Sequence, residues 1–114
     1  MVPHLNSLNE QEVKAWKVRL TSALLDLHQE RVPFIEGVRR VVAIANEPRD
    51  RDNDFDLFVV IDSETDHLPA DRVRQQCSSE WLATCDREAE EARLFYRVAL
   101  HQCIDQLLAK LQST

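Results

Sequence analysis

Apolar residues recur at helical spacing near the start of the chain. They follow a 3-4-3-4 pattern that places them on one stripe of a helix: Val13, Trp16, Leu20, Ala23 and Leu27. Ser7 with Glu10 fits a capping box at the start of this helix. Asn9 with Glu12 is a second candidate, and the pattern predicts that the helix ends near Glu30.

A second amphipathic pattern follows Pro33, a residue type favoured in the first turn of a helix. Its apolar face comprises Ile35, Val38, Val42 and Ala45. The adjacent charges of Arg39 and Arg40 break the alternation expected of a strand, so we predict a helix. The alternative is a strand hairpin between the β-branched run 38–45 and the apolar run 57–61.

The longest pattern lies at the C-terminal end and predicts one helix from about Glu80 to Leu111, capped by Ser78 or Ser79. The alanine and cysteine side chains of its apolar stripe are small. The whole stripe comprises Leu82, Cys85, Ala89, Ala92, Tyr96, Ala99 and Cys103. Small side chains permit the close approach of another helix. We therefore expect the first and last helices to pack together, with five residues mostly buried: Leu20, Leu24, Ala92, Tyr96 and Ala99.

The centre of the chain is less regular. The segment 47–54 is predicted to be a loop, and the apolar run 57–61 is short enough to be either a strand or a helix. The segment 62–69 is predicted to be a turn closed by side-chain to backbone hydrogen bonds, and 70–76 a helical turn. The sequence thus predicts a mainly α single domain over residues 1–114: a small helical bundle of two amphipathic helices and a long C-terminal helix, with residues 1–8 loose.

Composition agrees with a helical domain. A chain of 114 residues is long enough for one domain, and a single glycine argues against the many tight turns of a sandwich or barrel. The net charge is −6, yet the segment 47–71 alone holds nine acidic residues and two arginines, a local charge of −7. An acidic chain gains no counterion-release energy, so we expect neither nucleic acid nor an acidic membrane surface as partner.

Three cysteines, Cys77, Cys85 and Cys103, form no disulfide framework and no Cys-x-x-Cys pair. Residues 1–9 lack the basic and apolar regions of a signal peptide, and no apolar run reaches the length of a membrane span. We therefore expect reduced thiols in the cytoplasm. We also expect no stoichiometric metal and no cofactor.

The segment from Asp54 to Val60 resembles the second motif of minimal nucleotidyltransferases, in which a D-x-D pair on a strand holds magnesium and nucleotide phosphates. The resemblance implies a divalent-metal or nucleotide-handling domain with Asp54 and Asp56 as ligands, and this is the alternative function. The family has Gly-Ser ahead of the pair, where this chain has the run 44–46, Ile-Ala-Asn. A third carboxylate would come from a later strand, whereas everything after Pro69 has a helical pattern.

The segment 61–69, which reads IDSETDHLP and is followed by Arg74 and Trp81, resembles short bacterial proteins grouped as a domain of unknown function. The resemblance implies a small cytoplasmic bacterial protein and no particular activity.

The acidic turn and its flanks are the candidate binding face of a non-enzymatic protein-interaction or regulatory module, whose partner is another protein or a second copy. Six residues are the candidates for this face: Asp62, Glu64, Asp66, His67, Arg72 and Arg74. We expect Ser63 and Asp66 to hold the turn, and Glu64 and His67 to be available for binding. Arg72 and Arg74 are expected to neutralise Glu64 or Asp66.

Overall fold

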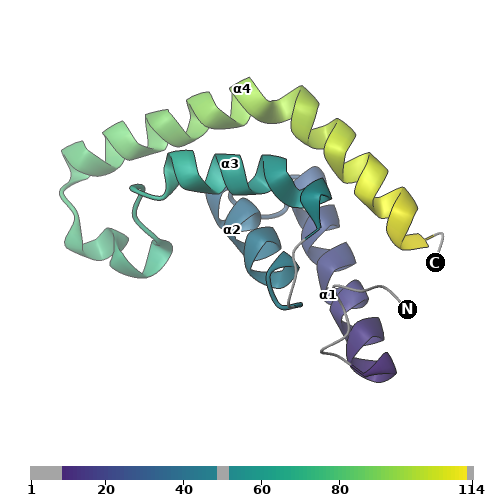
Figure 1. Ribbon diagram of the computed structural model, residues 1–114. Coiled ribbons are helices and arrows are strands. Elements are labelled where there is room, and N and C mark those ends of the chain that lie inside the picture. The colour runs from purple at the N-terminus through teal and green to yellow at the C-terminus, as the bar shows by residue number, and fades with distance from the viewer. Residues whose placement is uncertain (1–8, 49–51, 113–114) are drawn as a thin grey trace.

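The computed structural model describes residues 9–48 and 52–112, and every regular element within these ranges is a helix (Figure 1). The long helices are α1 (Glu10–His28), α2 (Phe34–Ala45), α3 (Asp56–Thr65) and α4 (Ser79–Gln112). Two 3₁₀ helices, η2 (Asn53–Phe55) and η3 (Asp71–Gln76), precede α3 and α4. The predicted small, mainly α bundle is therefore confirmed, and none of the described helices is long and apolar enough to cross a membrane.

Helix α1 starts at the second of the two predicted capping boxes. The Glu12 amide donates to the Asn9 side chain at 2.8 Å, and the Asn9 amide donates to the Glu12 carboxylate at 3.1 Å. The alternative cap, Ser7, lies outside the described residues. Pro33 precedes α2 as predicted, with its φ of −57° already suited to a helix start.

The connection between α1 and α2 is a tight left-handed cap. Glu30 has φ of +57°, the Glu30 amide donates to the carbonyl of Leu27, and the Arg31 amide donates to that of Asp26. This pair of bonds satisfies the last carbonyls of α1 and is usually built on glycine, because a side chain in this conformation costs about 1 kcal/mol. The Glu30 carboxylate accepts a hydrogen bond from Arg93 of α4 at 2.9 Å, so the strained turn is also tied to the last helix.

The core lies where α1, α2 and α3 meet the second half of α4. Its fully buried side chains come from all four helices: Leu20, Leu24, Val38, Val41, Phe58, Ile61 and Ile104. The buried Trp16 indole donates to the carbonyl of Ile44, in the last turn of α2, at 2.7 Å, so the indole N–H has a partner. At the junction of α1 and α2, the buried polar group is therefore hydrogen-bonded.

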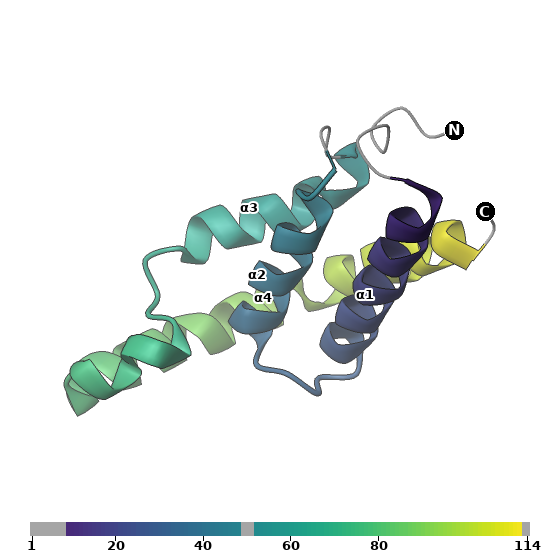
Figure 2. The same cartoon turned by 90° about the horizontal axis from the view of Figure 1, so that it is seen from below.

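Helix α4 extends beyond this core. Its 34 residues span about 51 Å at 1.5 Å per residue, as long as the whole molecule, whose largest extent is 50 Å. Figure 2 shows that its first half and η3 project away from α1, α2 and α3. We call this projecting half (79–97) the α4 arm. A second small apolar cluster of Ile35, Leu68 and Cys85 joins the arm to the rest of the molecule.

The predicted contact between the first and last helices is confirmed, but its α4 residues differ from the expected ones. Leu20 and Leu24 are buried, whereas Ala92 and Tyr96 are half-buried and Ala99 is exposed. The buried residues of the second half are Leu100, Ile104 and Leu107. One residue turns a helix by about 100°, so the core selects Leu100 over its neighbour Ala99 because leucine buries more apolar surface.

The central segment is helical for longer than predicted. The run 57–61 is a helix, so the strand alternatives are wrong, and α3 continues to Thr65 into the segment 62–65 that was expected to be a turn. Phe58, Ile61 and Thr65 are buried at 3-4 spacing, so one helical face crosses the expected boundary. The Thr65 hydroxyl donates to the carbonyl of Ile61 at 2.7 Å, which allows a polar side chain to be buried there. Of the predicted loop 47–54, residues 49–51 lie outside the described residues, and Asn53 and Asp54 belong to η2.

Phe58→Ala tests the assignment of the buried face of α3. Phe58 is 0% exposed, so its truncation should lower the free energy of unfolding by about 3–5 kcal/mol, measured by urea unfolding. Val60→Ala is the matched control on the same helix, because Val60 is 47% exposed and its truncation should change stability by no more than about 0.5 kcal/mol. Equal losses in the two variants would contradict this packing of α3.

Candidate functional site

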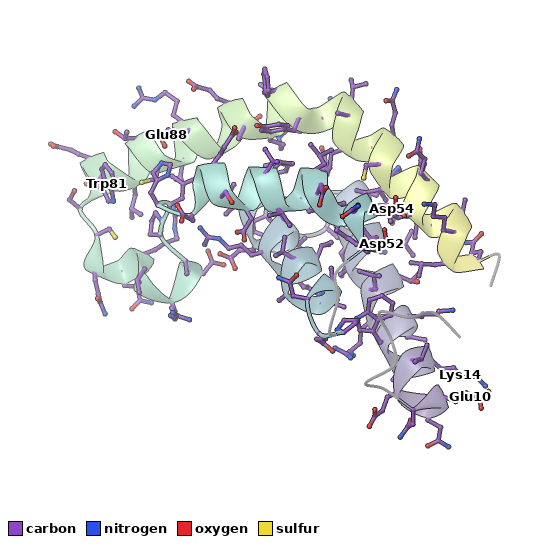
Figure 3. The ribbon with its side chains drawn as sticks, in the orientation of Figure 1. Glu10, Lys14, Asp52, Asp54, Trp81 and Glu88 are labelled. Atoms are coloured by element: carbon purple, nitrogen blue, oxygen red, sulfur yellow. The ribbon has the colours of Figure 1, made fainter. Side chains whose placement is uncertain are left out.

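The IDSETDHLP segment lies against the α4 arm because α3 runs antiparallel to α4. At the start of α3, the Cys103 thiol contacts the carbonyl of Asp54 at 3.5 Å. After the end of α3, His67 Nε2 lies 2.6 Å from the Glu88 carboxylate. The last turn of α3 and the residues that follow it are therefore held over the first half of α4. In Figure 3, Glu88 lies on the arm and Asp54 lies at the opposite end of α3.

A shallow, open hollow of about 490 Å³ lies between the end of α3 and the α4 arm. We call it the α3–α4 hollow. Its wall includes three carboxylates, two aromatic side chains and one imidazole: Glu64, His67, Glu88, Glu91, Phe95 and Tyr96. Two of the six candidates from the sequence, Glu64 and His67, are thus brought together here with residues of α4.

The Tyr96 hydroxyl donates to the Glu64 carboxylate across the hollow. This hydrogen bond raises the pKa of Tyr96, and burial and the negative charge of Glu64 act in the same direction. Tyr96 is therefore a neutral donor at physiological pH, and its hydroxyl fixes the position of the Glu64 carboxylate. His67 and Glu88 form the corresponding contact at the other edge of the hollow.

The structure places the side chains of the acidic turn differently from the expectation that Ser63 and Asp66 hold the turn. Glu64 and His67, expected to be available for binding, each contact α4. Ser63 and Asp66, expected to hold the turn, are exposed, and neither makes a side-chain hydrogen bond to another described residue. The cause is the extra turn of α3, which places Ser63 inside a helix rather than in a turn.

Arg39 of α2 holds the turn instead. Its Nη2 donates to the carbonyls of Thr65 and Leu68 at 3.0 and 2.9 Å, and its Nε lies 3.9 Å from the Asp62 carboxylate. A cation at the C-terminal end of a helix satisfies free carbonyls and interacts favourably with the helix dipole. In the sequence, Arg39 and Arg40 indicate only that the segment is a helix and not a strand. No local signal links Arg39 to the carbonyls of Thr65 and Leu68, which lie 26 and 29 positions later.

Arg74 does not neutralise Glu64 or Asp66 as expected. It forms a two-pronged pair with Asp86 of α4, with distances of 2.9 and 3.0 Å, and this pair holds η3 against the arm. The hydrogen bond from Arg74 lowers the pKa of Asp86, although burial opposes the shift. Arg72 is exposed. The arginines after the turn therefore do not enter the hollow.

An exposed apolar surface borders the hollow. Leu94, Phe95 and Val98 of α4 are 57%, 80% and 70% exposed, and Val60 of α3 is 47% exposed. We call these four residues the apolar patch. The half-exposed Trp81, near the start of the arm in Figure 3, precedes Phe95 by 14 residues. This spacing is about four helical turns, so helix geometry puts a second aromatic ring on the side of the arm that carries Phe95.

The geometry behind the alternative function is absent from the described residues. Asp54 lies in η2 and pairs with Lys110, and Asp56 begins α3, so the two carboxylates do not project from one face of a strand. Within 9–48 and 52–112, no three His, Cys, Asp or Glu side chains are grouped so that they could hold a metal ion. Burial raises the pKa values of Cys85 and Cys103, which keeps both thiols protonated.

The bond between Tyr96 and Glu64 predicts an alkaline titration that can be measured directly. Tyr96 is the only tyrosine, so the ultraviolet absorbance change of tyrosine ionisation reports this residue alone. In Glu64→Gln the pKa of Tyr96 should fall back toward that of free tyrosine, whereas Asp66→Asn, the control for nearby charge, should leave it raised.

The same hydrogen bond makes stability depend on pH. The folded protein holds the phenol proton of Tyr96 more tightly than the unfolded chain does. The contribution of this bond to the free energy of unfolding is therefore complete below the ordinary pKa of tyrosine, and it is lost as the pH rises through the raised pKa of Tyr96.

In the titration experiment, an unchanged pKa of Tyr96 in Glu64→Gln would contradict the hydrogen bond between Tyr96 and Glu64.

A scan against protein-family models finds no match to this chain, and searches of the curated proteins and of the solved structures find none either. What the chain does is therefore inferred from the α3–α4 hollow and the apolar patch beside it.

Proposed function

We propose that the chain is a non-enzymatic protein-interaction module whose binding face combines the apolar patch with the carboxylates of the α3–α4 hollow. One observation carries the proposal: Phe95, a large aromatic side chain, is 80% exposed between two other exposed apolar residues of α4. Exposed apolar clusters rimmed by polar residues mark interaction sites in folded proteins. Phe95 is the side chain that we propose as the anchor of the interface.

Apolar burial would supply the affinity of this face. Covering a side chain of the size of Phe95 contributes roughly 2–3 kcal/mol, and aromatic residues are enriched among the few that dominate an interface. Val98 and Leu94 lie within one helical turn of Phe95 and widen the area that a partner covers. An amphipathic helix of the partner, laid across the α4 arm, matches such a strip.

The carboxylates around the patch define the charge of the partner. Glu64 and Glu88 line the hollow with polar contacts to Tyr96 and His67, and Glu91 is exposed without an ion pair to any described residue. Charges at the rim of an interface mainly set association rate and orientation. The proposed partner therefore presents apolar anchors flanked by lysine or arginine.

The carboxylates around the patch favour a different protein as the partner over a second copy of this chain. A two-fold contact through this face would bring the carboxylates of Glu64, Glu88 and Glu91 near their own counterparts, because a two-fold interface uses the same surface on both chains. Juxtaposed like charges oppose such a complex. Three free cysteines and the IDSETDHLP resemblance support a bacterial cytoplasm as the place where it acts.

Phe95→Ser tests the function in affinity purification from bacterial cells, with quantitative mass spectrometry of the captured proteins. A partner held by the patch should be recovered at least about tenfold less with Phe95→Ser than with the unchanged chain. Val18→Ser is the matched control, because Val18 is 69% exposed but lies on α1. Glu91→Gln should weaken capture at low salt more than at high salt.

Circular dichroism establishes that each variant keeps its helices. Equal recovery of the same proteins by folded Phe95→Ser and by the unchanged chain would refute the proposed face. Loss of the partner with Val18→Ser but not with Phe95→Ser would place the interaction on α1.

A further inference from the structure

A second concave surface lies on the other side of the arm. It is a cavity of about 370 Å³ between the α1–α2 connection, the segment 68–74 and α4. We call it the α2–α4 trough. Its α4 residues, from Cys85 to His101, lie almost opposite Phe95 and Val98 around the helix, because each residue turns the helix by about 100°. The trough is thus separate from the apolar patch, and nothing inferred about it rests on the proposed function.

The trough is long. Its α4 wall runs over the seventeen residues from Cys85 to His101, which is about 24 Å at a rise of 1.5 Å per residue. A ligand that follows a wall of this length is an extended chain and not a compact ring system. The volume itself lies within the range of small-molecule pockets, roughly 300–1,000 Å³.

The floor of the trough is apolar. It is formed by the small cluster that joins the arm to the molecule, together with residues at the ends of α1 and α2: Leu27, Phe34, Ile35, Leu68, Cys85 and Leu100. Burial keeps the Cys85 thiol protonated, so it contributes as a small apolar group. The floor therefore suits the hydrocarbon part of a ligand.

Most charged side chains at the rim are paired. Arg93 donates both to Glu30 at 2.9 Å and to Glu90 at 2.6 Å, Arg74 pairs with Asp86, and Glu36 lies 3.6 Å from Arg39. The hydrogen bond from Arg93 lowers the pKa of Glu90. Because Arg93 serves two carboxylates, these pairs leave negative charge at the rim and do not cancel it completely.

Arg97 is different. It lines the trough next to Leu100 and His101 and forms neither an ion pair nor a hydrogen bond with any described residue. It therefore offers a guanidinium without a bonded partner among the described residues at one end of an apolar channel. Asp71 lines the opposite end, beside the pair of Arg74 and Asp86, so the two ends of the trough differ in sign.

We propose that the trough binds an extended-chain amphipathic anion of the class of medium-chain alkyl carboxylates, with its carboxylate on Arg97 and its chain over Leu68 and Cys85. The orientation follows from the two ends, since Asp71 repels a carboxylate and Arg97 attracts it. The apolar floor supplies affinity in proportion to the hydrocarbon that it removes from water. Arg97 supplies the preference for an acid over an alcohol of the same chain length.

The test is a titration of the ¹⁵N-labelled full chain with decanoate, and separately with decan-1-ol as the neutral probe, followed by amide chemical shifts. Decanoate should bind saturably at one site, with the largest shifts in residues 34–36, 68–71 and 85–101. It should bind about tenfold more tightly than decan-1-ol, a difference of about 1.4 kcal/mol.

Two pairs of variants separate the head group from the chain. Arg97→Gln should remove the preference for decanoate and leave decan-1-ol unchanged, whereas Arg87→Gln, an exposed arginine of the same helix outside the trough, should change neither. Ala89→Leu should fill the floor and weaken both probes, whereas Ala83→Leu, at an exposed α4 position outside the trough, should weaken neither.

Three results would overturn the proposal. They are shifts that scatter over the surface without saturating, equal affinity of the unchanged chain for the two probes, and decanoate shifts centred on Leu94, Phe95 and Val98 instead of the trough. None of these results refutes the capture of a protein partner through the apolar patch, so the two proposals fail independently.

Discussion

The length of α4 is the constraint on which the rest of the structure depends. Its 34 residues are nearly twice the 19 residues of α1, so a core built on α1, α2 and α3 can cover only its second half. A helix without tertiary contacts is marginally stable in water. The connection from α3 to α4 therefore has to return along the arm, and its contacts fix the arm in place: Tyr96 with Glu64, His67 with Glu88, and Arg74 with Asp86. Both concave surfaces exist because the arm is only partly covered.

These polar contacts position the arm more than they stabilise it. His67, Glu88 and Asp86 are about half-exposed at the side chain, and exposed ion pairs contribute only about 0–1 kcal/mol. The apolar contribution at the arm comes from the small cluster of Ile35, Leu68 and Cys85, whereas the main core contains sixteen buried residues. Local opening requires the least free energy where few apolar groups are buried. The arm is therefore the part of the molecule whose position a bound partner or ligand is best able to stabilise.

The helices were predictable because helical periodicity is a local property of the sequence. Capping residues and apolar spacing predict the boundaries of α1, α2 and α4. The predicted boundaries agree with the observed ones to within about two residues. The face of α4 that is buried was not predictable to the same degree. Ala99 and Leu100 are adjacent, and the choice between them depends on the shape of a core formed by residues far away in sequence. The end of α3 was missed for a related reason, since Thr65 was included in the predicted turn 62–69, whereas a hydrogen bond to the carbonyl of Ile61 allows its burial in the helix.

The acidic segment shows how far charge alone can locate a site. Its carboxylates do not act as one surface, because the fold separates them. Asp54 pairs with Lys110 near the end of α4, Asp62 faces Arg39 of α2, and Glu64 accepts from Tyr96 of the arm. Each of these contacts joins residues at least 23 positions apart, so no local pattern specifies them. The apolar patch was equally invisible, because Leu94, Phe95 and Val98 are compatible with a buried helical face until the arm is seen to project from the core. The binding face that we propose is therefore defined by the exposed apolar residues of the patch, and the few carboxylates that the fold places beside them would set the charge of the partner.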